Sequence, residues 1–193
     1  MLRSFYDWTL RSAGHRHAER WLALVAFLES SVFPIPPDVM IVPMVLADRA
    51  KAWRIALIAT LASVAGGMLG YAVGAVFFEQ IGQPILEFYG YGEKFQNFAE
   101  RYNDWGAWIV FGAGVTPFPY KVITIASGVT DLNIRIFFVA SGLARGLRFS
   151  IVAALLWWFG PPIRRLLEKH LGLITLGFFI LLFGGFLVIK WLL

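Results

Sequence analysis

The sequence predicts an all-α integral membrane protein with an inverted repeat of a re-entrant helical hairpin plus a transmembrane helix, and with a further C-terminal transmembrane helix. Composition is the first observation behind this class: 59% of the 193 residues are hydrophobic and only 15% are charged. A soluble domain has about 25% charged residues. A chain of this size has too little interior to bury that much apolar surface, which includes 8 Trp and 18 Phe. Lipid is therefore the solvent that fits this composition.

Long apolar stretches are the second observation. Five of them follow one another along the chain, at residues 21–47, 55–78, 105–129, 134–160 and 171–193. The stretch 55–78 carries no charge and is long enough to span about 30 Å of hydrocarbon. The stretch 134–160 is also long enough, although it contains arginines. We therefore expect 55–78, 134–160 and 171–193 to be transmembrane helices.

Prolines within two of these stretches are the third observation. Pro34, Pro36 and Pro37 interrupt 21–47, whereas Pro117 and Pro119 interrupt 105–129. Proline removes a backbone donor and clashes with the preceding turn, so a helix should stop at each group. Irregular backbone at membrane depth is tolerated only inside protein or beside a water-filled cavity. Since neither stretch is long enough to cross twice, each is predicted to be a re-entrant hairpin with its prolines at the tip.

The distribution of charges predicts the orientation. Segments 1–20 and 48–54 are basic, segment 79–104 is rich in acids, and segment 161–170 is basic again. Basic segments stay in the cytoplasm. We therefore expect a cytoplasmic N-terminus, a first hairpin that enters from the cytoplasm, an outward crossing, a second hairpin that enters from outside, and a return crossing. The protein is thus expected to be a multi-pass membrane protein, and 171–193 is expected to cross outward again.

The chain is expected to form one membrane domain with five parts: a basic N-terminus 1–20, a first hairpin-plus-helix repeat 21–78, an outside connector 79–104, a second inverted repeat 105–160 and a C-terminal helix 171–193. Within the connector, 92–104 carries its aromatic side chains on one helical face, which is typical of an interfacial helix. Inverted repeats with broken helices are a transporter architecture. The alternative is a duplicated scaffold without a transport role.

Several classes of function are excluded or disfavoured. The chain has no Cys, which excludes disulfides, thiolate metal sites and a Cys nucleophile. Its three His lie in interfacial segments without metal-ligand spacing, so we expect no metal, no cofactor and no enzymatic activity. The net charge of +5 comes mostly from residues that flank apolar stretches, which argues against nucleic acid as a partner.

Two acids and a lysine in the hairpins are candidate functional residues. Glu29 lies in an apolar run, where a charged side chain costs roughly 2.5–3.5 kcal/mol, and burial favours its protonated form. It is a candidate proton site, or else a protonated side chain that bonds free backbone near the prolines. Asp38 and Lys121 each follow a proline tip. We expect them to form an ion pair between the tips, although Asp38 also suits a helix N-cap.

Two arginines lie deep in the stretch 134–160. Arg145 and Arg148 are three residues apart and share a helix face. In a protein-lined cavity, two guanidinium groups suit a phosphate. The alternative is that they neutralise Glu29 and Asp38.

Glycines spaced by four are expected to allow close helix packing. They are Gly66, Gly70 and Gly74 in the second stretch, and Gly142 and Gly146 in the fourth.

These motifs resemble the DedA family, also called the SNARE-associated or VTT-domain family, over about residues 20–165. The resemblance is carried by Glu29 upstream of the Pro34-Ile-Pro-Pro-Asp38 turn, by the run 92–108 that leads into the second proline turn with a basic residue, and by Ala126-Ser-Gly. It implies a protein of the bacterial inner membrane that translocates a phospholipid or undecaprenyl phosphate across it, coupled to protons.

The family pattern has two essential acids in the first hairpin, which Glu29 and Asp38 match, and two arginines around the second. Lys121 stands near the place of the second arginine, whereas the first has no counterpart in the segment 112–117. Arg145 or Arg148 would supply that cation. The expected partners are membrane lipids with an anionic head group or phosphate, protons, and a second copy in a homo-oligomer. A small-solute or ion-coupled transporter and a non-catalytic membrane-integrity scaffold are the alternative functions.

Overall fold

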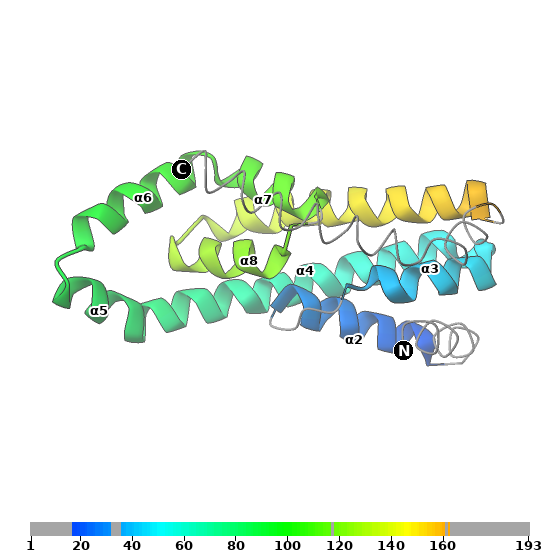
Figure 1. The fold of residues 1–193 in the computed structure, drawn as a ribbon, viewed down its shortest axis with the longest axis horizontal. Helices are drawn as coiled ribbons and strands as arrows, with labels where there is room; N and C mark the ends of the chain where they lie inside the picture. Colours follow the sequence, from blue (N-terminus) through cyan, green and yellow to red (C-terminus); the bar gives the residue numbers. More distant parts are fainter. Residues whose placement is uncertain (1–16, 32–35, 117, 161, 163–193) are drawn as a thin grey trace.

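The computed structural model describes residues 17–31, 36–116, 118–160 and 162. All regular secondary structure in these residues is helical, as predicted (Figure 1). The predicted C-terminal helix 171–193 and most of the basic N-terminus lie outside the described residues. The elements are α2 (Ala18–Ser31), α3 (Asp38–Ala47), the 3₁₀ turn η1 (Arg49–Lys51), α4 (Ala52–Phe77), the π-turn η2 (Phe78–Gly82), α5 (Gln83–Phe88), α6 (Gly92–Asp104), α7 (Gly106–Val115), α8 (Tyr120–Val129) and the helix Ile134–Gly160.

The first proline group separates two short helices. α2 has 14 residues and α3 has 10, and the two run in opposite directions (Figure 1). Both are shorter than the approximately 20 residues that a membrane-spanning helix needs. Pro37 takes the N-cap position of α3, where its missing N–H costs nothing. Pro36 lies just before it, whereas Pro34 lies outside the described residues.

The second proline group has the same effect. α7 and α8 have 10 residues each and reverse direction at 116–119 (Figure 1). Thr116 leaves α7 with extended backbone, and Pro119 is the N-cap residue of α8. Pro117 lies outside the described residues. Each long helix thus follows a helical hairpin in the chain. Whether the hairpins are re-entrant and form an inverted repeat depends on the membrane, and this stays a prediction.

Two helical segments are long and apolar enough to cross a membrane, Arg49–Phe88 with 40 residues and Ile134–Gly160 with 27. The second has the predicted bounds. The first extends beyond the predicted 55–78, because residues 79–88 stay helical instead of beginning a loop. A π-turn absorbs Gly82, and Pro84 lies in the first turn of α5, where proline is tolerated. The helical run ends at Phe88, and the chain then turns at Gly90, which has a φ of 70°.

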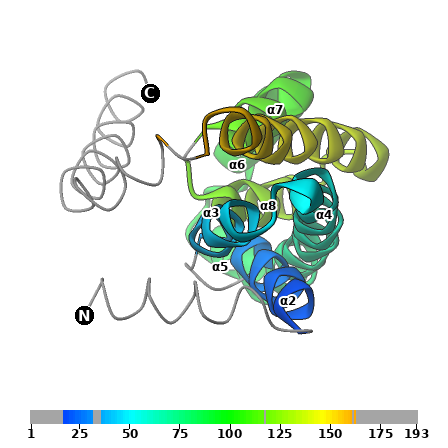
Figure 2. The ribbon, with the colours of Figure 1, turned by 90° about the vertical axis from the view of Figure 1, so that its right-hand side faces the viewer.

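Small residues on α4 let three helices meet closely. α4 lies beside α2 and α8 (Figure 2). A Cβ atom at Gly66 would overlap the backbone of Phe27 in α2, and one at Gly74 would overlap the backbone of Ile125 in α8. Gly70 faces Thr124. The predicted close packing at Gly142 is wrong within the described residues, because a Cβ there would meet nothing within 4 Å.

α6 is attached to the end of the second hairpin. Its bounds match the amphipathic segment predicted from the sequence. Tyr102 shares a hydrogen bond of 3.0 Å with Ser127, and Asn103 donates to the carbonyl of Thr130 at 2.7 Å. Burial raises the pKa of Tyr102, and the bond to Ser127 acts in the opposite direction, so the phenol is neutral at physiological pH. These bonds hold the connector against α8.

The interior has two apolar clusters. The first contains Leu22, Ile41, Val45, Ile55, Ala59, Phe149 and Ala153. The second contains Tyr71, Val110, Tyr120, Leu132, Phe137 and Ala140. On α4, Ser63 lies between the residues of the first cluster and those of the second. On Ile134–Gly160, Arg145 lies between the two clusters in the same way. A polar layer therefore crosses the molecule between two apolar layers.

Candidate functional site

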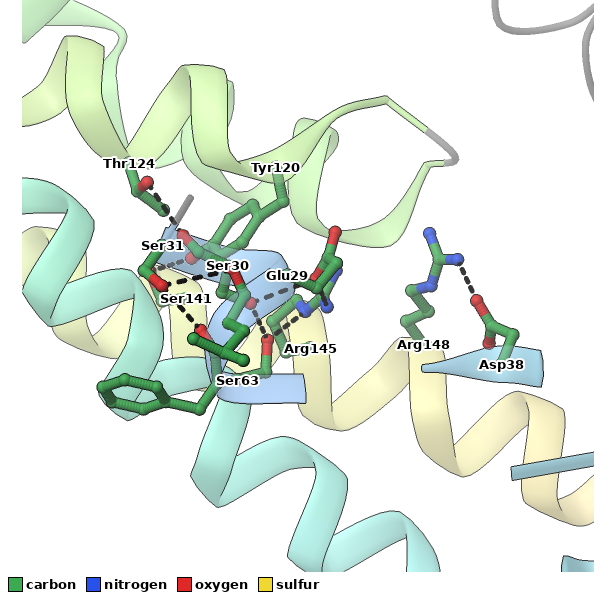
Figure 3. A network of polar contacts seen from close by, with 12 residues as sticks. Glu29, Ser30, Ser31, Asp38, Ser63, Tyr120, Thr124, Ser141, Arg145 and Arg148 are labelled. Carbon is green, nitrogen blue, oxygen red and sulfur yellow. Dashed lines mark hydrogen bonds and ion pairs between the residues drawn. The ribbon is translucent and has the colours of Figure 1, made fainter. Parts of the chain in front are cut away.

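Arg145 is the centre of the polar layer. Its side chain is only 2% exposed, and its Nη2 donates to Oε2 of Glu29 in α2 at 2.7 Å (Figure 3). The Glu29 side chain is 15% exposed. A buried charge is tolerated only when it is paired and hydrogen-bonded. The pair thus joins the first hairpin to the middle of the long helix.

Two serine hydroxyls complete a ring with this ion pair. Arg145 Nε donates to Ser63 Oγ at 2.6 Å, Ser63 and Ser30 share a bond of 2.6 Å, and Ser30 donates to Glu29 Oε2 at 3.1 Å (Figure 3). Since the Ser30 proton points to Glu29, Ser63 is the donor in the bond between the serines. Every bond in the ring therefore runs from the arginine toward the carboxylate. Such chains of bonds polarise one another.

Aromatic rings cover the guanidinium of Arg145. Its Cζ lies 4.9 Å from the ring centroid of Tyr120 and 4.7 Å from that of Phe149. Both distances are within the range of cation–π attraction. Tyr120 in turn donates its hydroxyl to Ser141. The second hairpin thus contributes a wall of the same site through the first residue of α8.

Arg148 forms a second pair one turn further along the helix. Its Nη2 donates to Asp38 Oδ2 at 2.6 Å, and its Nη1 donates to the carbonyl of Thr116 at 2.7 Å. The side chains of Arg148 and Asp38 are 17% and 27% exposed. One arginine therefore holds the start of α3 and the tip of the second hairpin together. Asp38 Oδ1 and Arg148 Nε are buried atoms with no partner among the described residues.

A direct hydrogen bond also joins the two hairpins. Thr124 of α8 donates to the carbonyl of Ser30 at 3.1 Å. The hydroxyl is also 2.9 Å from the carbonyl of Lys121. The carbonyl of Ser30 belongs to the last turn of α2, where intrahelical donors run out. The polar layer is therefore built from both hairpins and both long helices.

The predicted ion pair between Asp38 and Lys121 is wrong, because Asp38 pairs with Arg148. Within the described part of the chain, Lys121 is partly buried in α8 and forms no ion pair. The prediction equated matching positions after the prolines with facing positions in space. In the structure the rotation of the long helix decides the partner, and it turns Arg148 toward α3. The two arginines face Glu29 and Asp38, which is the charge-neutralising arrangement left open by the sequence.

Four further residues of the site were not predicted from the sequence, namely Ser30, Ser63, Tyr120 and Thr124. Their signal was weak, since hydroxyl side chains are frequent even in membrane helices, where they often bond their own backbone. Among the described residues, no three His, Cys, Asp or Glu side chains gather as a metal site would require. The guanidinium groups of Arg145 and Arg148 now bind carboxylates, and the same groups can bind a phosphate instead.

Comparison with known proteins relates this chain to a family. A sequence profile of the VTT domain matches residues 33–157. The chain is 34% identical over 187 residues to an uncharacterized protein of Haemophilus influenzae, and 35% identical over 187 residues to one of Histophilus somni, with 97% of both chains covered in each case. No solved structure matches it. The matched region contains both proline groups, α4, most of Ile134–Gly160 and three of the four charged residues of the site, and the chain is therefore a membrane protein of the VTT-domain or DedA family.

Proposed function

We propose that the protein is a membrane lipid transporter, which moves a phospholipid or a polyprenyl phosphate across the bacterial inner membrane. The family indicates membrane transport or a lipid-related function. The observation that carries the proposal is the pairing of Arg145 with Glu29 and of Arg148 with Asp38 between broken helices and a long apolar helix. Ionisable groups at membrane depth usually mark a pathway for substrate or protons. The proposal assigns no enzymatic activity.

The two pairs support an exchange mechanism. A guanidinium fork binds a phosphate in the same bidentate manner as a carboxylate. A lipid phosphate that reaches Arg148 competes with Asp38, whose released carboxylate takes up a proton because it has lost its cation. When the phosphate leaves, Asp38 gives up the proton and pairs again. The charge in the site stays balanced in both states, so lipid movement is coupled to proton movement.

Glu29 and Arg145 form the deeper step of the same pathway. Arg148 and Asp38 are partly exposed, whereas Arg145 is almost fully buried. We infer that the phosphate meets Arg148 first and reaches Arg145 only when the hairpins separate. The contact between Thr116 and Arg148 supports this order, because the same arginine that holds Asp38 also holds the tip of the second hairpin. Loss of that hold frees the tip to move.

Transport across the membrane requires that the hairpins enter from opposite sides. The basic segments around the first hairpin favour the cytoplasmic side, together with a cytoplasmic N-terminus, and the acidic connector favours the outside for the second hairpin. The repeated order of hairpin and long helix supports an inverted repeat. The two tips then meet near the midplane from opposite sides, which is the geometry of alternating access.

Translocation in liposomes tests the proposed function. The purified protein is reconstituted with a leaflet-resolved fluorescent phosphatidylglycerol under a set pH gradient. Asp38→Asn is expected to lower the translocation rate at least about tenfold and to remove its dependence on the gradient, because asparagine cannot carry the exchanged proton. Asp48→Asn is the matched control, because Asp48 caps the C-terminal end of the same helix and its 2.9 Å ion pair with Lys51 is exposed. The translocation rate of this variant is expected to match that of the unchanged protein.

Three results would contradict the proposal. Translocation by Asp38→Asn at the unchanged rate would remove Asp38 from the mechanism. No translocation of any phosphate-bearing lipid by the unchanged protein, together with flux of an ion or small solute, would favour the other transporter class. Equal lipid and ion flux in liposomes with and without the protein would favour a scaffold without a transport role.

Cysteine labelling tests the topology. The chain has no Cys, so a single introduced cysteine is read without background. We expect a membrane-impermeant maleimide to label Glu100→Cys only from outside and Arg54→Cys only from the cytoplasm, because acidic and basic segments face opposite sides. Labelling of Glu100→Cys from the cytoplasm alone would overturn the proposed orientation.

A further inference from the structure

A lateral groove lies between α7 and the helix Ile134–Gly160, away from the polar layer. Its volume is about 550 Å³, and its walls are almost entirely apolar, with Trp108 and Phe111 on one side and Ile136, Val139 and Leu143 on the other. The two helices run side by side in the same direction (Figures 1 and 2). They approach closely where Gly114 faces Ala144, next to Leu143 at one end of the groove. The other end opens beside the start of the long helix.

A single cation stands at the open end. Arg135 lines the groove and is exposed, and within the described residues its side chain forms no ion pair. The neighbouring polar group does not bind it, because Asn133 Oδ1 accepts from the backbone N–H groups of Arg135 and Ile136 as a helix cap. A guanidinium without a partner, at the mouth of an apolar groove, matches a molecule with an anionic head and an apolar tail.

We propose that this groove binds one anionic glycerophospholipid, with its phosphate on Arg135 and an acyl chain between Trp108 and Leu143. Trp108 is 70% exposed, which suits an indole ring at the head-group level of a membrane. An arginine at the same level binds a phosphate through charge-assisted hydrogen bonds. The charge complementarity at one end and the apolar walls along the rest recognise the two halves of the same molecule.

The distribution of charge along the groove favours a lipid over a helix of this protein or of a second copy. From Arg135 to Leu143 the groove is about 12 Å long at 1.5 Å per residue. Its walls are apolar along that length, and Arg135 is the one charged residue among the described residues that line it. A lipid has this same distribution, with a charged head group at one end and an apolar chain along the rest, whereas a helix would need an acid at this one point.

This site is distinct from the proposed transport site. Successive residues turn by about 100° around a helix, which puts Ile136, Val139 and Leu143 about 120–180° away from Arg145, and Arg135 about 80° away from it. Arg145 accordingly packs against α2 and α4, whereas the groove residues face α7. The lipid in the groove need not be the lipid that is moved. Its binding is measured on the purified protein without any transport, so the two proposals fail separately.

Native mass spectrometry of the detergent-purified full chain, titrated with phosphatidylglycerol and with phosphatidylcholine, tests the head-group contact. We expect one phosphatidylglycerol to stay bound and Arg135→Gln to weaken its affinity about fivefold, the usual contribution of one basic side chain near a membrane surface. Arg101→Gln is the matched control, because Arg101 is an exposed arginine on α6, outside the groove. Its affinity for the lipid is expected to stay unchanged.

A groove-filling variant tests the acyl-chain contact. Ala107 is exposed and lines the groove, so Ala107→Trp should fill it and weaken binding of the same lipid, whereas Ala72→Trp on an exposed face of α4 should not. Phosphatidylglycerol with a diazirine in the acyl chain should cross-link to peptides that contain 107–111 or 136–143. The proposal is overturned if Arg135→Gln and Ala107→Trp both bind the lipid as the unchanged protein does. It is also overturned if the cross-links fall elsewhere, or if Ala107→Trp changes only the oligomeric state.

Discussion

Arg145→Met is expected to lower the free energy of unfolding by about 3–5 kcal/mol, because it leaves the carboxylate of Glu29 in the interior without its cation. The arginine also donates to Ser63 and is covered by two aromatic rings, so the change removes several contacts at once. Glu29→Gln should have a cost of the same order, since it leaves the buried guanidinium unpaired. Unfolding in mixed micelles with increasing dodecyl sulfate, followed by circular dichroism, measures these differences.

The double variant separates the ion pair from the other contacts. Glu29→Gln with Arg145→Met leaves neither charge unpaired, so its loss should be clearly smaller than the sum of the two single losses. The matched control is the exposed pair of Arg54 and Glu19, which has the same 2.7 Å separation. Arg54→Met should cost only about 0–1 kcal/mol, because water screens this pair. A loss for Arg145→Met no larger than that for Arg54→Met would contradict the buried pair.

A double-mutant cycle on Asp38 and Arg148 is expected to give a coupling energy of about 1–3 kcal/mol. The single changes Asp38→Asn and Arg148→Met each break the bond of 2.6 Å, so the second change costs little once the first is made. The partly exposed position of this pair keeps the expected coupling below that of Glu29 and Arg145. The same unfolding measurement supplies all four free energies.

Lys121 provides the contrast for this cycle. The structure contains no ion pair between Lys121 and Asp38, so the losses for Asp38→Asn and Lys121→Met should add within about 0.5 kcal/mol. Strong coupling of Asp38 to Lys121, with additive losses for Asp38 and Arg148, would reverse the assignment of the partner. It would support the tip-to-tip pair that the symmetry of the sequence suggests.

The sequence alone determined the helical class and most of the element boundaries. The apolar stretches reappear as α4 and as Ile134–Gly160, since a continuous apolar stretch of that length can satisfy its backbone hydrogen bonds within itself as one spanning helix. The prolines set the residues at which α3 and α8 begin, because a missing N–H and a fixed φ act locally. The aromatic face of 92–104 likewise sufficed to outline α6. All these features depend on interactions within one segment.

The partners of the charged residues were decided only by the tertiary structure. Sequence spacing indicates that Arg145 and Arg148 lie on similar faces of one helix, but each residue turns by about 100°, so a small rotation of that helix changes which acid each arginine meets. The ring that links Ser63 and Ser30 to Glu29 depends on how closely α4 approaches α2, which the backbone contact at Gly66 permits. The groove beside Arg135 depends on where α7 packs on the long helix. Such contacts join segments far apart in the chain, and a pattern within one segment carries no information about the rotation and depth at which another packs against it.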